Sequence, residues 1–493
     1  MKKIIIGRDF WLLLVVFVLS RILIRLVGIH FDYIALYGYW QYLNVETLRF
    51  NLLRGVWFDH AQPPIFNLIL GTVLKIGGSY APLLFNLLLK GISFANTLLI
   101  RGILKKIGIP EKWVLAISLL YMLSPGTIIL ENELFYTTFI SLLLLSSVFL
   151  LVRITQNPSL KNVWLLILPL SILCLSRSLY HILWLTVVLA TMVWFLRKAI
   201  PIRKLLVPVM VCLVLVGSWY MKNKIIFGYF TTSTWIGMNF SRNVFHDSDI
   251  RDSSRIESYE PFSPITTYRK FISGGLERKF AGLNDMDLLP AFKNDSSVNE
   301  NNINYMQVSD EYMKASKKYI KSHPIGYLKN VVESGIIFFT PVTRYPLLEV
   351  KAKKMKWYDA IYSLNLSQFA EGKNERRLAL SISAIPQLIL YLVVFTYLAG
   401  MAFRNREISL FNIFIMLTIG YVFLASSFFE HYENMRFRFE ATPLFLVLLA
   451  QAIMIRGNRD NKKGGDPMHR FWENQKTSPK LTATPLEPPV PHP

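Results

Sequence analysis

The feature that most constrains this chain is a series of long apolar windows. Each window holds about 17 to 25 mainly apolar residues, which is enough for a helix to cross a bilayer. In lipid only helices and closed barrels satisfy their backbone groups, and these runs are too long and unbroken for barrel strands. Of the 493 residues, 53% are hydrophobic and only 17% are charged. We therefore predict an all-α polytopic membrane protein with about ten transmembrane helices, at 10–28, 80–100, 113–130, 134–152, 161–177, 181–197, 205–221, 379–403, 408–428 and 440–456.

Two apolar segments need separate treatment. The N-terminal segment has the basic start and apolar core of a signal peptide, but it has no small-x-small cleavage site. Arg21 and Arg25 also interrupt the end of its apolar run, so we expect an uncleaved first helix. The stretch 64–79 is short and contains glycines. We expect it to lie at the interface or to dip into the membrane without spanning it.

Charge predicts the orientation of these helices. Nineteen Lys or Arg and three acids occur in the segments 1–8, 101–112, 153–161, 197–204, 404–407 and 456–463. Five basic residues and eight acids occur in the short segments 28–63, 131–133, 177–181 and 429–440. The positive-inside rule then predicts that both termini are cytoplasmic. The net charge of +22 follows from these basic helix ends, so we do not interpret it as a sign of nucleic-acid binding.

The predicted helices divide the chain into four parts. Residues 1–221 form an N-terminal membrane module that includes a first outer loop at 29–79. Residues 222–378 are polar and rich in Asn, Ser and Tyr, and they suffice for a small extracytoplasmic domain of mixed secondary structure. Residues 379–456 supply the last helices, and the Pro-rich tail 457–493 is expected to be disordered in the cytoplasm.

Every short loop on the predicted outer side carries acids or bases beside apolar helices. The candidates are Asp32, Glu46, Asp59 and His60 in the first loop, Glu131 and Glu133 in the second, Arg177 and His181 in the third, and Glu430, His431, Glu433, Arg436 and Arg438 in the last. Carboxylates can act as a general base or hold a divalent cation, and the planar fork of Arg suits a phosphate. These residue types predict a cavity at the outer membrane face in which a phosphate-bearing lipid reacts.

Structural roles are the alternative for several of these residues. Arg436 and Glu440 are four residues apart and could form an ion pair along one helix. Glu133 could favour the start of a helix through the helix dipole. Arg177 and His181 could cap a helix end.

Four motifs, in this order along the chain, resemble the GT-C membrane glycosyltransferases. Within that group they resemble the branch of protein O-mannosyltransferases and bacterial lipid A aminoarabinose transferases, which is similar to bacterial glycosyltransferase family 39. The motifs are the first loop from Asp32 to Glu46 with "HAQPP" (60–64), "ENELFYT" (131–137), "KNKIIFGYFTTSTWIGMNFSRN" (222–243) and "ENMRFRFEATPLF" (433–445). The resemblance covers most of residues 1–456.

The resemblance implies a transferase in a bacterial plasma (inner) membrane, with its active site outside the cytoplasm. Such an enzyme takes a sugar from a polyprenyl-phosphate donor, inverts the anomeric centre and releases polyprenyl phosphate. An acid of the first outer loop deprotonates the acceptor, and basic residues near the membrane surface hold the phosphate. Some members use a divalent metal ion. The implied phosphate-binding residues are Arg436, Arg438 and Arg177.

The identity of the base stays open at this point. Members of this family usually have an acidic pair in the first loop, whereas Asp32 has no acidic neighbour. The candidates, in order, are Asp32, Glu46 and Asp59, with Glu133 as an acid that orients the acceptor. Glu131, His60, His181, His431 and Glu433 are further candidates for the cavity.

Two other functions fit the same pattern. One is a transporter or flippase of a lipid-linked glycan, which would place charges within the membrane and show paired halves. The other is a polymerase or ligase of polysaccharide chains. The sequence specifies neither the sugar nor the acceptor, which could be a protein, a lipid or a glycan. We expect no nucleic-acid partner.

Overall fold

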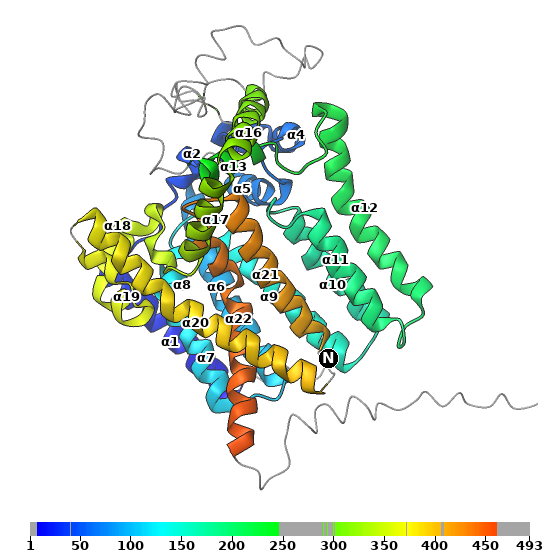
Figure 1. Ribbon diagram of the computed structural model, residues 1–493, viewed down its shortest axis with the longest axis vertical. Helices are drawn as coiled ribbons and strands as arrows, with labels where there is room; N and C mark the ends of the chain where they lie inside the picture. Colours follow the sequence, from blue (N-terminus) through cyan, green and yellow to red (C-terminus); the bar gives the residue numbers. More distant parts are fainter. Residues whose placement is uncertain are drawn as a thin grey trace, which may run out of the picture.

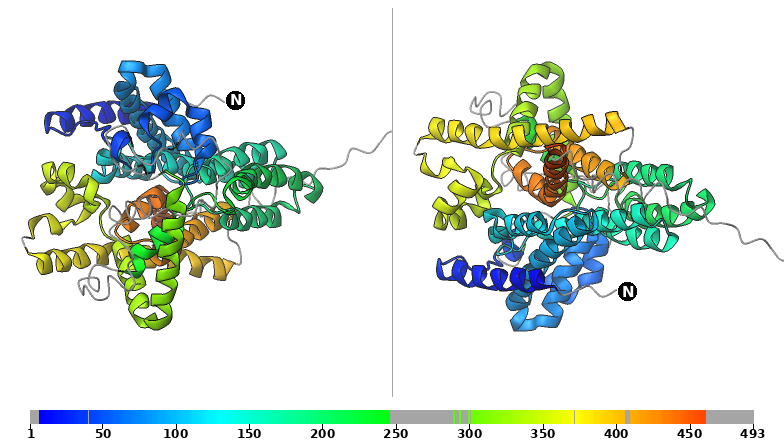
Figure 2. Two further views of the ribbon diagram at one scale, coloured as in Figure 1. Left: turned by 90° about the horizontal axis from the view of Figure 1, so that it is seen from above. Right: turned by 90° about the horizontal axis from the view of Figure 1, so that it is seen from below.

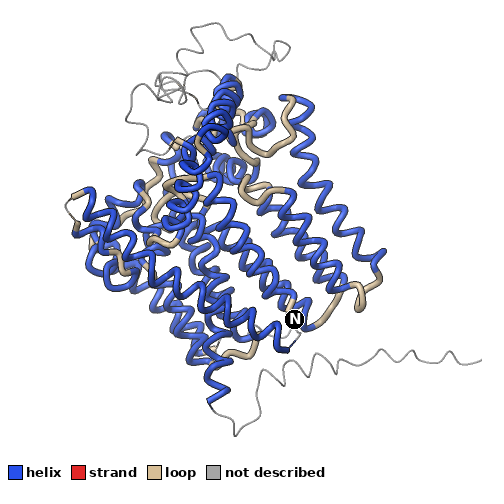
Figure 3. The backbone as a smooth tube through the Cα atoms, in the orientation of Figure 1, coloured by secondary structure: helices blue, strands red, loops and turns tan. Residues whose placement is uncertain are grey.

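The computed structural model describes residues 7–39, 41–245, 289, 293, 299, 301–370, 372–405 and 409–460. Helices joined by loops make up this part of the chain, and it holds no β-strand (Figure 3). Residues 246–288 of the expected outer domain lie outside the described residues, as does the expected disordered tail from residue 461 onward.

The helices follow one another in a simple order. The first part of the described chain, up to residue 227, contains α1 (Arg8–Leu26), α2 (Ala35–Gly38), α3 (Val45–Phe50), α4 (Leu52–Phe58), α5 (Pro64–Gly77), η1 (Gly78–Tyr80), α6 (Ala81–Lys106), α7 (Glu111–Leu123), α8 (Pro125–Leu130), α9 (Thr137–Gln156), α10 (Leu160–Cys174), α11 (Ile182–Leu196) and α12 (Ile202–Phe227). The remainder forms α13 (Ile236–Val244), α16 (Asn304–Ser322), α17 (Pro324–Phe338), η3 (Val342–Arg344), η4 (Pro346–Leu348), α18 (Glu349–Lys354), α19 (Lys356–Ser363), η5 (Leu366–Phe369), α20 (Lys373–Asn405), α21 (Leu410–Phe429) and α22 (Asn434–Asp460).

The described chain contains six helical stretches that are long and apolar enough to cross a membrane. They are Pro64–Lys106, Thr137–Gln156, Ile202–Phe227, Leu378–Gly400, Leu410–Phe429 and Asn434–Met454. α10 and α11 are apolar but shorter. The protein is therefore an all-α, multi-pass membrane protein, as the sequence predicted. The number of ten spans stays a prediction.

The apolar window 113–130 is two helices instead of one. α7 ends at Leu123, and α8 begins at Pro125. Ser124 lies between them, and its hydroxyl accepts a hydrogen bond from the Thr127 amide at 3.1 Å. Proline is favoured at the first position of a helix because it has no amide hydrogen to leave unpaired there, so Pro125 can begin a new helix directly after the break. The break turns the chain toward the loop 131–136.

The helices pack as one bundle around α9. This helix contacts α6 and α10 on either side in the sequence, and also α21 and α22 from the C-terminal part. α10, α11 and α12 lie together at one side of the bundle, and α1 and α7 lie at the other (Figures 1 and 2).

One end of the bundle is formed by the helices α2 to α5 and α13, together with the longer α16, and we call this end the cap (top of Figure 1). Two buried contacts hold the cap together. The Lys222 ammonium at the end of α12 donates to the carbonyls of Trp57 and Asp59 at 2.9 and 3.0 Å. The His60 ring contacts the Thr234 hydroxyl at 2.7 Å.

The segment 222–378 is not separated from the membrane helices. α13 and α16 pack on each other in the cap, but α17 packs against α20, α21 and α22. The described residues of this segment form helices and loops only, whereas we expected mixed secondary structure. The division of the chain into domains otherwise stays a prediction.

Candidate functional site

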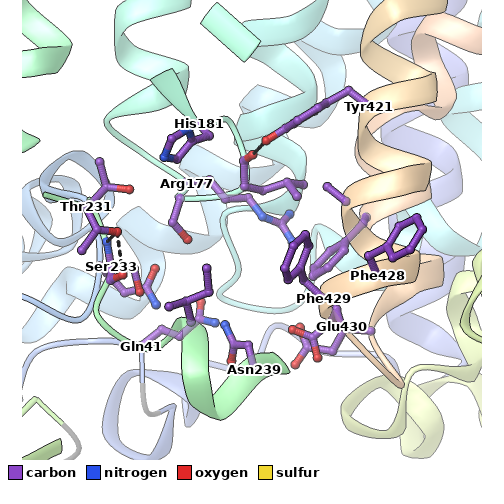
Figure 4. A pocket seen from close by; sticks show the side chains of 18 of the residues that line it. Gln41, Arg177, His181, Thr231, Ser233, Asn239, Tyr421, Phe428, Phe429 and Glu430 are labelled. Atoms are coloured by element: carbon purple, nitrogen blue, oxygen red, sulfur yellow. Dashed lines mark hydrogen bonds between the residues drawn. The ribbon is translucent and has the colours of Figure 1, made fainter. Parts of the chain in front are cut away.

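A cavity of about 520 Å³ lies where α11, α21 and α22 meet the cap. α21 forms one side of it, with Tyr421, Phe428 and Phe429, while Gln41, Thr231 and Ser233 stand on the other side (Figure 4). The complete lining is Gln41, Gln62, Tyr136, Arg177, Ser178, Leu179, His181, Leu183, Thr231, Thr232, Ser233, Ile236, Asn239, Tyr421, Leu424, Ala425, Phe428, Phe429, Glu430, Glu433, Arg436 and Phe437. Charged groups from the loops therefore share one space with apolar side chains of the bundle.

Arg436 is the most deeply placed charge of the cavity. It lies in the first turn of α22 and is 1% exposed. Its guanidinium carbon stands 5.2 Å from the ring centre of Tyr136 and 5.4 Å from that of Phe437. Nη2 forms an ion pair with Glu433 and donates to the Tyr136 hydroxyl at 3.4 Å. Within the described chain, its Nε and Nη1 have no hydrogen-bond partner.

Arg177 lies beside Arg436 and shares its aromatic neighbours. It belongs to the loop between α10 and α11 and is 4% exposed. Its guanidinium carbon stands 4.1 Å from the ring centre of Phe437 and 5.1 Å from that of Tyr136. Its ion-pair partner is Glu440, which is fully buried in α22. Glu440 thus pairs with Arg177, although its spacing from Arg436 had also fitted an ion pair.

Two carboxyl groups, Glu430 and Glu433, face the arginines from the turn between α21 and α22. Burial raises the pKa of Glu430 to about 7, and the nearby Arg242 only partly opposes this shift. Burial would also raise the pKa of Glu433, but Arg436 and Arg242 outweigh it and hold that pKa at about 2. Arg242 Nη1 is 3.4 Å from a Glu430 oxygen. Glu433 is therefore a permanent counterion, whereas Glu430 can exchange a proton near neutral pH.

The remaining walls combine hydrogen-bonding groups with an exposed apolar edge. The Tyr136 hydroxyl donates to the Gln41 amide oxygen at 2.7 Å. On the apolar side, Leu183 is 69% exposed, Leu424 54% and Phe429 47%. These side chains belong to α11 and α21, both apolar helices. The apolar edge of the cavity therefore reaches the outer surface of the helix bundle.

Glu131 and Glu133 each form an ion pair with another helix. Glu131 is fully buried, and its two oxygens accept from Nε and Nη2 of Arg21 at 2.7 Å each. Glu133 accepts from the Lys351 ammonium at 2.6 Å. Burial raises the pKa of Glu133 to about 7; Lys351 opposes this shift, and the charge of Asp32 adds to it. Neither glutamate lines the cavity described above.

Asp32 lies directly beside Glu133. The two residues form an isolated parallel β-bridge, in which the Asp32 amide donates to the carbonyl of Asn132 at 2.9 Å. Glu46 is exposed in the first turn of α3, where the Asn44 side chain caps the helix. Neither acid is among the residues that line the cavity. Their assignment as the base stays a prediction.

Asp59 and His60 hold the cap. The Asp59 carboxylate accepts from the Ala61 amide at 2.8 Å and from the Asn67 side chain at 3.0 Å. Burial raises its pKa to about 6. His60 contacts the Asn301 carbonyl at 3.1 Å through Nε2, and burial lowers its pKa to about 4. His60 is therefore neutral near pH 7 and joins the first loop to distant segments of the cap.

The other basic candidates divide between the cavity and the packing around it. His181 lines the cavity and also caps α11, because its Nδ1 accepts from the Leu183 amide at 3.2 Å. His431 is buried, and its Nδ1 lies 2.9 Å from the Ser334 hydroxyl of α17. Arg438 donates to the Thr340 carbonyl at 3.1 Å and does not line the cavity.

The structure brings Arg177, His181, Glu433 and Arg436 together, and it adds residues for which we predicted no role. Glu430 belongs to the last outer loop that the sequence indicated, but no role was predicted for it. Tyr136 lies within the motif 131–137, whose two glutamates are the predicted site residues. Gln41 carried no signal, because a glutamine in an aromatic loop is unremarkable. The described residues contain no group of three or more His, Cys, Asp or Glu that could hold a metal ion.

Comparison of the whole chain with protein-family models, with curated proteins and with solved structures finds no match. The resemblance to the GT-C enzymes therefore depends on the sequence motifs and their order along the chain alone.

Proposed function

We propose that this protein is a membrane glycosyltransferase that moves a sugar from a polyprenyl-phosphate donor to an acceptor at the extracytoplasmic face. One observation supports the proposal: two neighbouring arginines, Arg177 and Arg436, lie at the polar end of a cavity whose other edge is apolar. Arg436 keeps two guanidinium donors without a hydrogen-bond partner in the described structure, although the side chain is 1% exposed. Buried donors without partners are costly, which favours a site that an anion completes.

The chemistry of the walls favours a lipid phosphate over a free phosphate. Guanidinium groups bind phosphate oxygens through paired hydrogen bonds. The exposed apolar side chains Leu183, Leu424 and Phe429 continue the cavity to the surface of two apolar helices. A free phosphate would leave this apolar edge uncovered, whereas the isoprenoid chain of a lipid donor would cover it.

The proposed reaction is a displacement at the anomeric carbon. A hydroxyl or amine of the acceptor forms a new bond to that carbon, and the bond between this carbon and the phosphate oxygen breaks. The electron pair leaves with the phosphate, whose charge Arg436 and Arg177 stabilise. The acceptor proton passes to a carboxylate, for which we assign Glu430, because it lines the cavity and its pKa of about 7 suits a base.

The test is sugar transfer by the purified protein in nanodiscs, with a panel of polyprenyl-phosphate sugars as donors and a membrane extract as acceptor. We expect released polyprenyl phosphate from wild type, and a loss of about 100-fold or more in Arg436→Gln. Because that change removes the nearest ion-pair partner of Glu433 and leaves only Arg242 at 3.7 Å, the double variant Glu433→Gln/Arg436→Gln is measured as well. Arg438→Gln is the matched control, since Arg438 is buried in the same helix but outside the cavity.

The same assay separates the other candidates for the base and for the function. We compare Glu430→Gln with Asp32→Asn, Glu46→Gln and Glu133→Gln. The variant that folds but no longer transfers sugar identifies the residue that acts as the base. Equal losses in Arg438→Gln and Arg436→Gln would remove the argument for a phosphate site. If no donor is consumed but the protein moves a lipid-linked glycan across vesicles, it is a transporter. If the product is an extended glycan chain, it is a polymerase or ligase.

A further inference from the structure

A helical hairpin between α17 and α20 exposes large apolar side chains beside lysines. We call it the 346–369 hairpin; it comprises η4, α18, α19 and η5. Its exposed apolar residues include Val350 at 71%, Trp357 at 68% and Ile361 at 80%. Lys353 and Lys356 are exposed on the same two short helices. An apolar surface of this kind is unfavourable in water, which indicates that lipid or another protein covers it.

The hairpin is attached to helices of the membrane bundle. On α19, the Tyr358 hydroxyl donates to the Leu123 carbonyl at 2.6 Å, and the Tyr362 hydroxyl donates to the Leu120 carbonyl. Both carbonyls belong to the last turn of α7. On α18, the Lys354 ammonium donates to the Gly28 carbonyl just after α1. Figure 1 shows α18 and α19 at the side of the bundle, next to α8 and α1.

The chain on both sides of the hairpin also lies against membrane helices. α17 packs on α20, α21 and α22 before the hairpin begins. After the hairpin, the candidate span Leu378–Gly400 begins within α20. The hairpin is therefore bounded along the chain, as well as in space, by elements of the bundle.

From these observations we infer that the 346–369 hairpin lies in the outer leaflet of the bilayer, with anionic lipid head groups around its lysines. Trp357 and Ile361 are four residues apart and share one face of α19, which would enter the acyl boundary. Trp is favoured at the level of the head groups. The Lys stems can follow the apolar surface while their ammonium groups reach lipid phosphates. This inference does not depend on the proposed transferase activity.

The opposite face of the hairpin connects to the predicted acids. The Lys351 ammonium contacts Glu133 at 2.6 Å, and Glu133 lies beside Asp32. Asp359 is fully buried on α19 and accepts hydrogen bonds from Thr343 and Asn365. The hairpin thus has one polar, paired face toward the protein and one apolar face without a protein partner in the described chain.

The test uses the full-length protein in nanodiscs, with an environment-sensitive fluorophore on a single introduced cysteine. Ile361→Cys reports on the hairpin, and Lys317→Cys on exposed α16 in the cap is the matched control. Cys174 and Cys212 are buried and are replaced by Ala in both. Lipids with a quencher high on the acyl chain should quench the label at position 361 at least about twofold more than the label at 317.

A charge variant tests the lipid class. Lys353→Glu/Lys356→Glu should weaken quenching at position 361 in anionic nanodiscs and leave it unchanged in zwitterionic ones. Equal quenching at 361 and 317 would overturn the inference and favour a face that binds another protein. If quenching at position 361 is strong but does not change with lipid charge or with the lysine substitutions, the inferred binding of anionic head groups is wrong. Correct folding is checked by a single size-exclusion peak for each variant.

Discussion

At the scale of single residues, the buried charges of this protein have two different uses. The Arg21 guanidinium is fully satisfied: Nε and Nη2 donate to Glu131 at 2.7 Å each, and Nη1 donates to the Ser20 hydroxyl and the Met122 carbonyl. Arg436 is equally buried, yet Nε and Nη1 keep no partner among the described residues. A structural ion pair needs every donor filled, whereas a binding site needs some donors kept for its ligand. Arg438 also keeps its Nε without a hydrogen-bond partner in the described structure, but it does not line the cavity. The combination of unfilled donors and a place in the cavity wall therefore distinguishes Arg436.

The pH dependence of transfer tests the role of Glu430. Burial raises the pKa of this carboxyl to about 7, so it is protonated at pH 5 and ionised at pH 9. A base acts in its ionised form, and transfer should therefore rise as the pH increases through about 7 and then level off. Glu430→Gln should lower kcat by about 100-fold or more and remove this rise. The measurement is kcat against pH in nanodiscs.

A stability measurement on the same variant controls for folding. Because the folded-state pKa of Glu430 lies above that of an unfolded Glu, its ionisation costs stability as the pH rises from about 4 to 7. The free energy of unfolding of Glu430→Gln should therefore exceed that of wild type at pH 8, and the difference between the two proteins should be smallest at pH 4. A variant that is inactive and also unstable at pH 8 would contradict the assignment of a buried, titrating base.

At the scale of elements, the cap depends on a close crossing of α13 and α16. The Gly237 amide donates to the Ser309 hydroxyl at 3.0 Å. A Cβ at position 237 would collide with the Ser309 carbonyl, which is backbone and cannot rotate away. Gly237→Ala should therefore separate the two helices and destabilise the cap by about 1 to 3 kcal/mol. Hydrogen exchange should increase in α13 and α16.

Gly420→Ala in α21 is the control for this prediction, because nothing lies within 4 Å of a Cβ there. If both variants showed the same exchange in α13 and α16, the close crossing would not contribute to the cap. α13 supplies Asn239 to the cavity, and the loop before α13 supplies Thr231 and Ser233, so loosening of the cap should also reduce transfer.

The elements show how far the sequence could predict this structure. Apolar windows identified the long helices because their signal is local and strong. The break at Ser124 and Pro125 was missed because both residues are hidden in an apolar run. Arg436 and Arg438 are two residues apart, so on one helix they face different sides, and only one could reach the cavity. The partners of Glu131 and Arg177 lie in distant helices, and no local pattern reveals such pairs.

At the scale of the whole molecule, the proposed function depends on which side of the membrane the cap occupies. Basic residues concentrate at one end of the predicted helices, which favours a cytoplasmic position for that end. The loop between α11 and α12 carries Arg197 and Lys198 and lies far from the cap in Figure 1. α16 of the cap lies at the opposite end. The two ends should therefore differ in access from outside the cell.

Cysteine labelling in intact cells tests this orientation. A membrane-impermeant maleimide should label Lys317→Cys in α16 at once, and Lys198→Cys only after the membrane is opened, because both positions are exposed in the structure. The reverse pattern would place the arginine cavity on the cytoplasmic side, where nucleotide-activated sugars are available. The proposal of a polyprenyl-phosphate donor would then no longer be supported, while Arg177 and Arg436 could still bind a phosphate. Labelling would thus separate the chemistry of the cavity, which the side chains carry, from the donor, which depends on the side of the membrane.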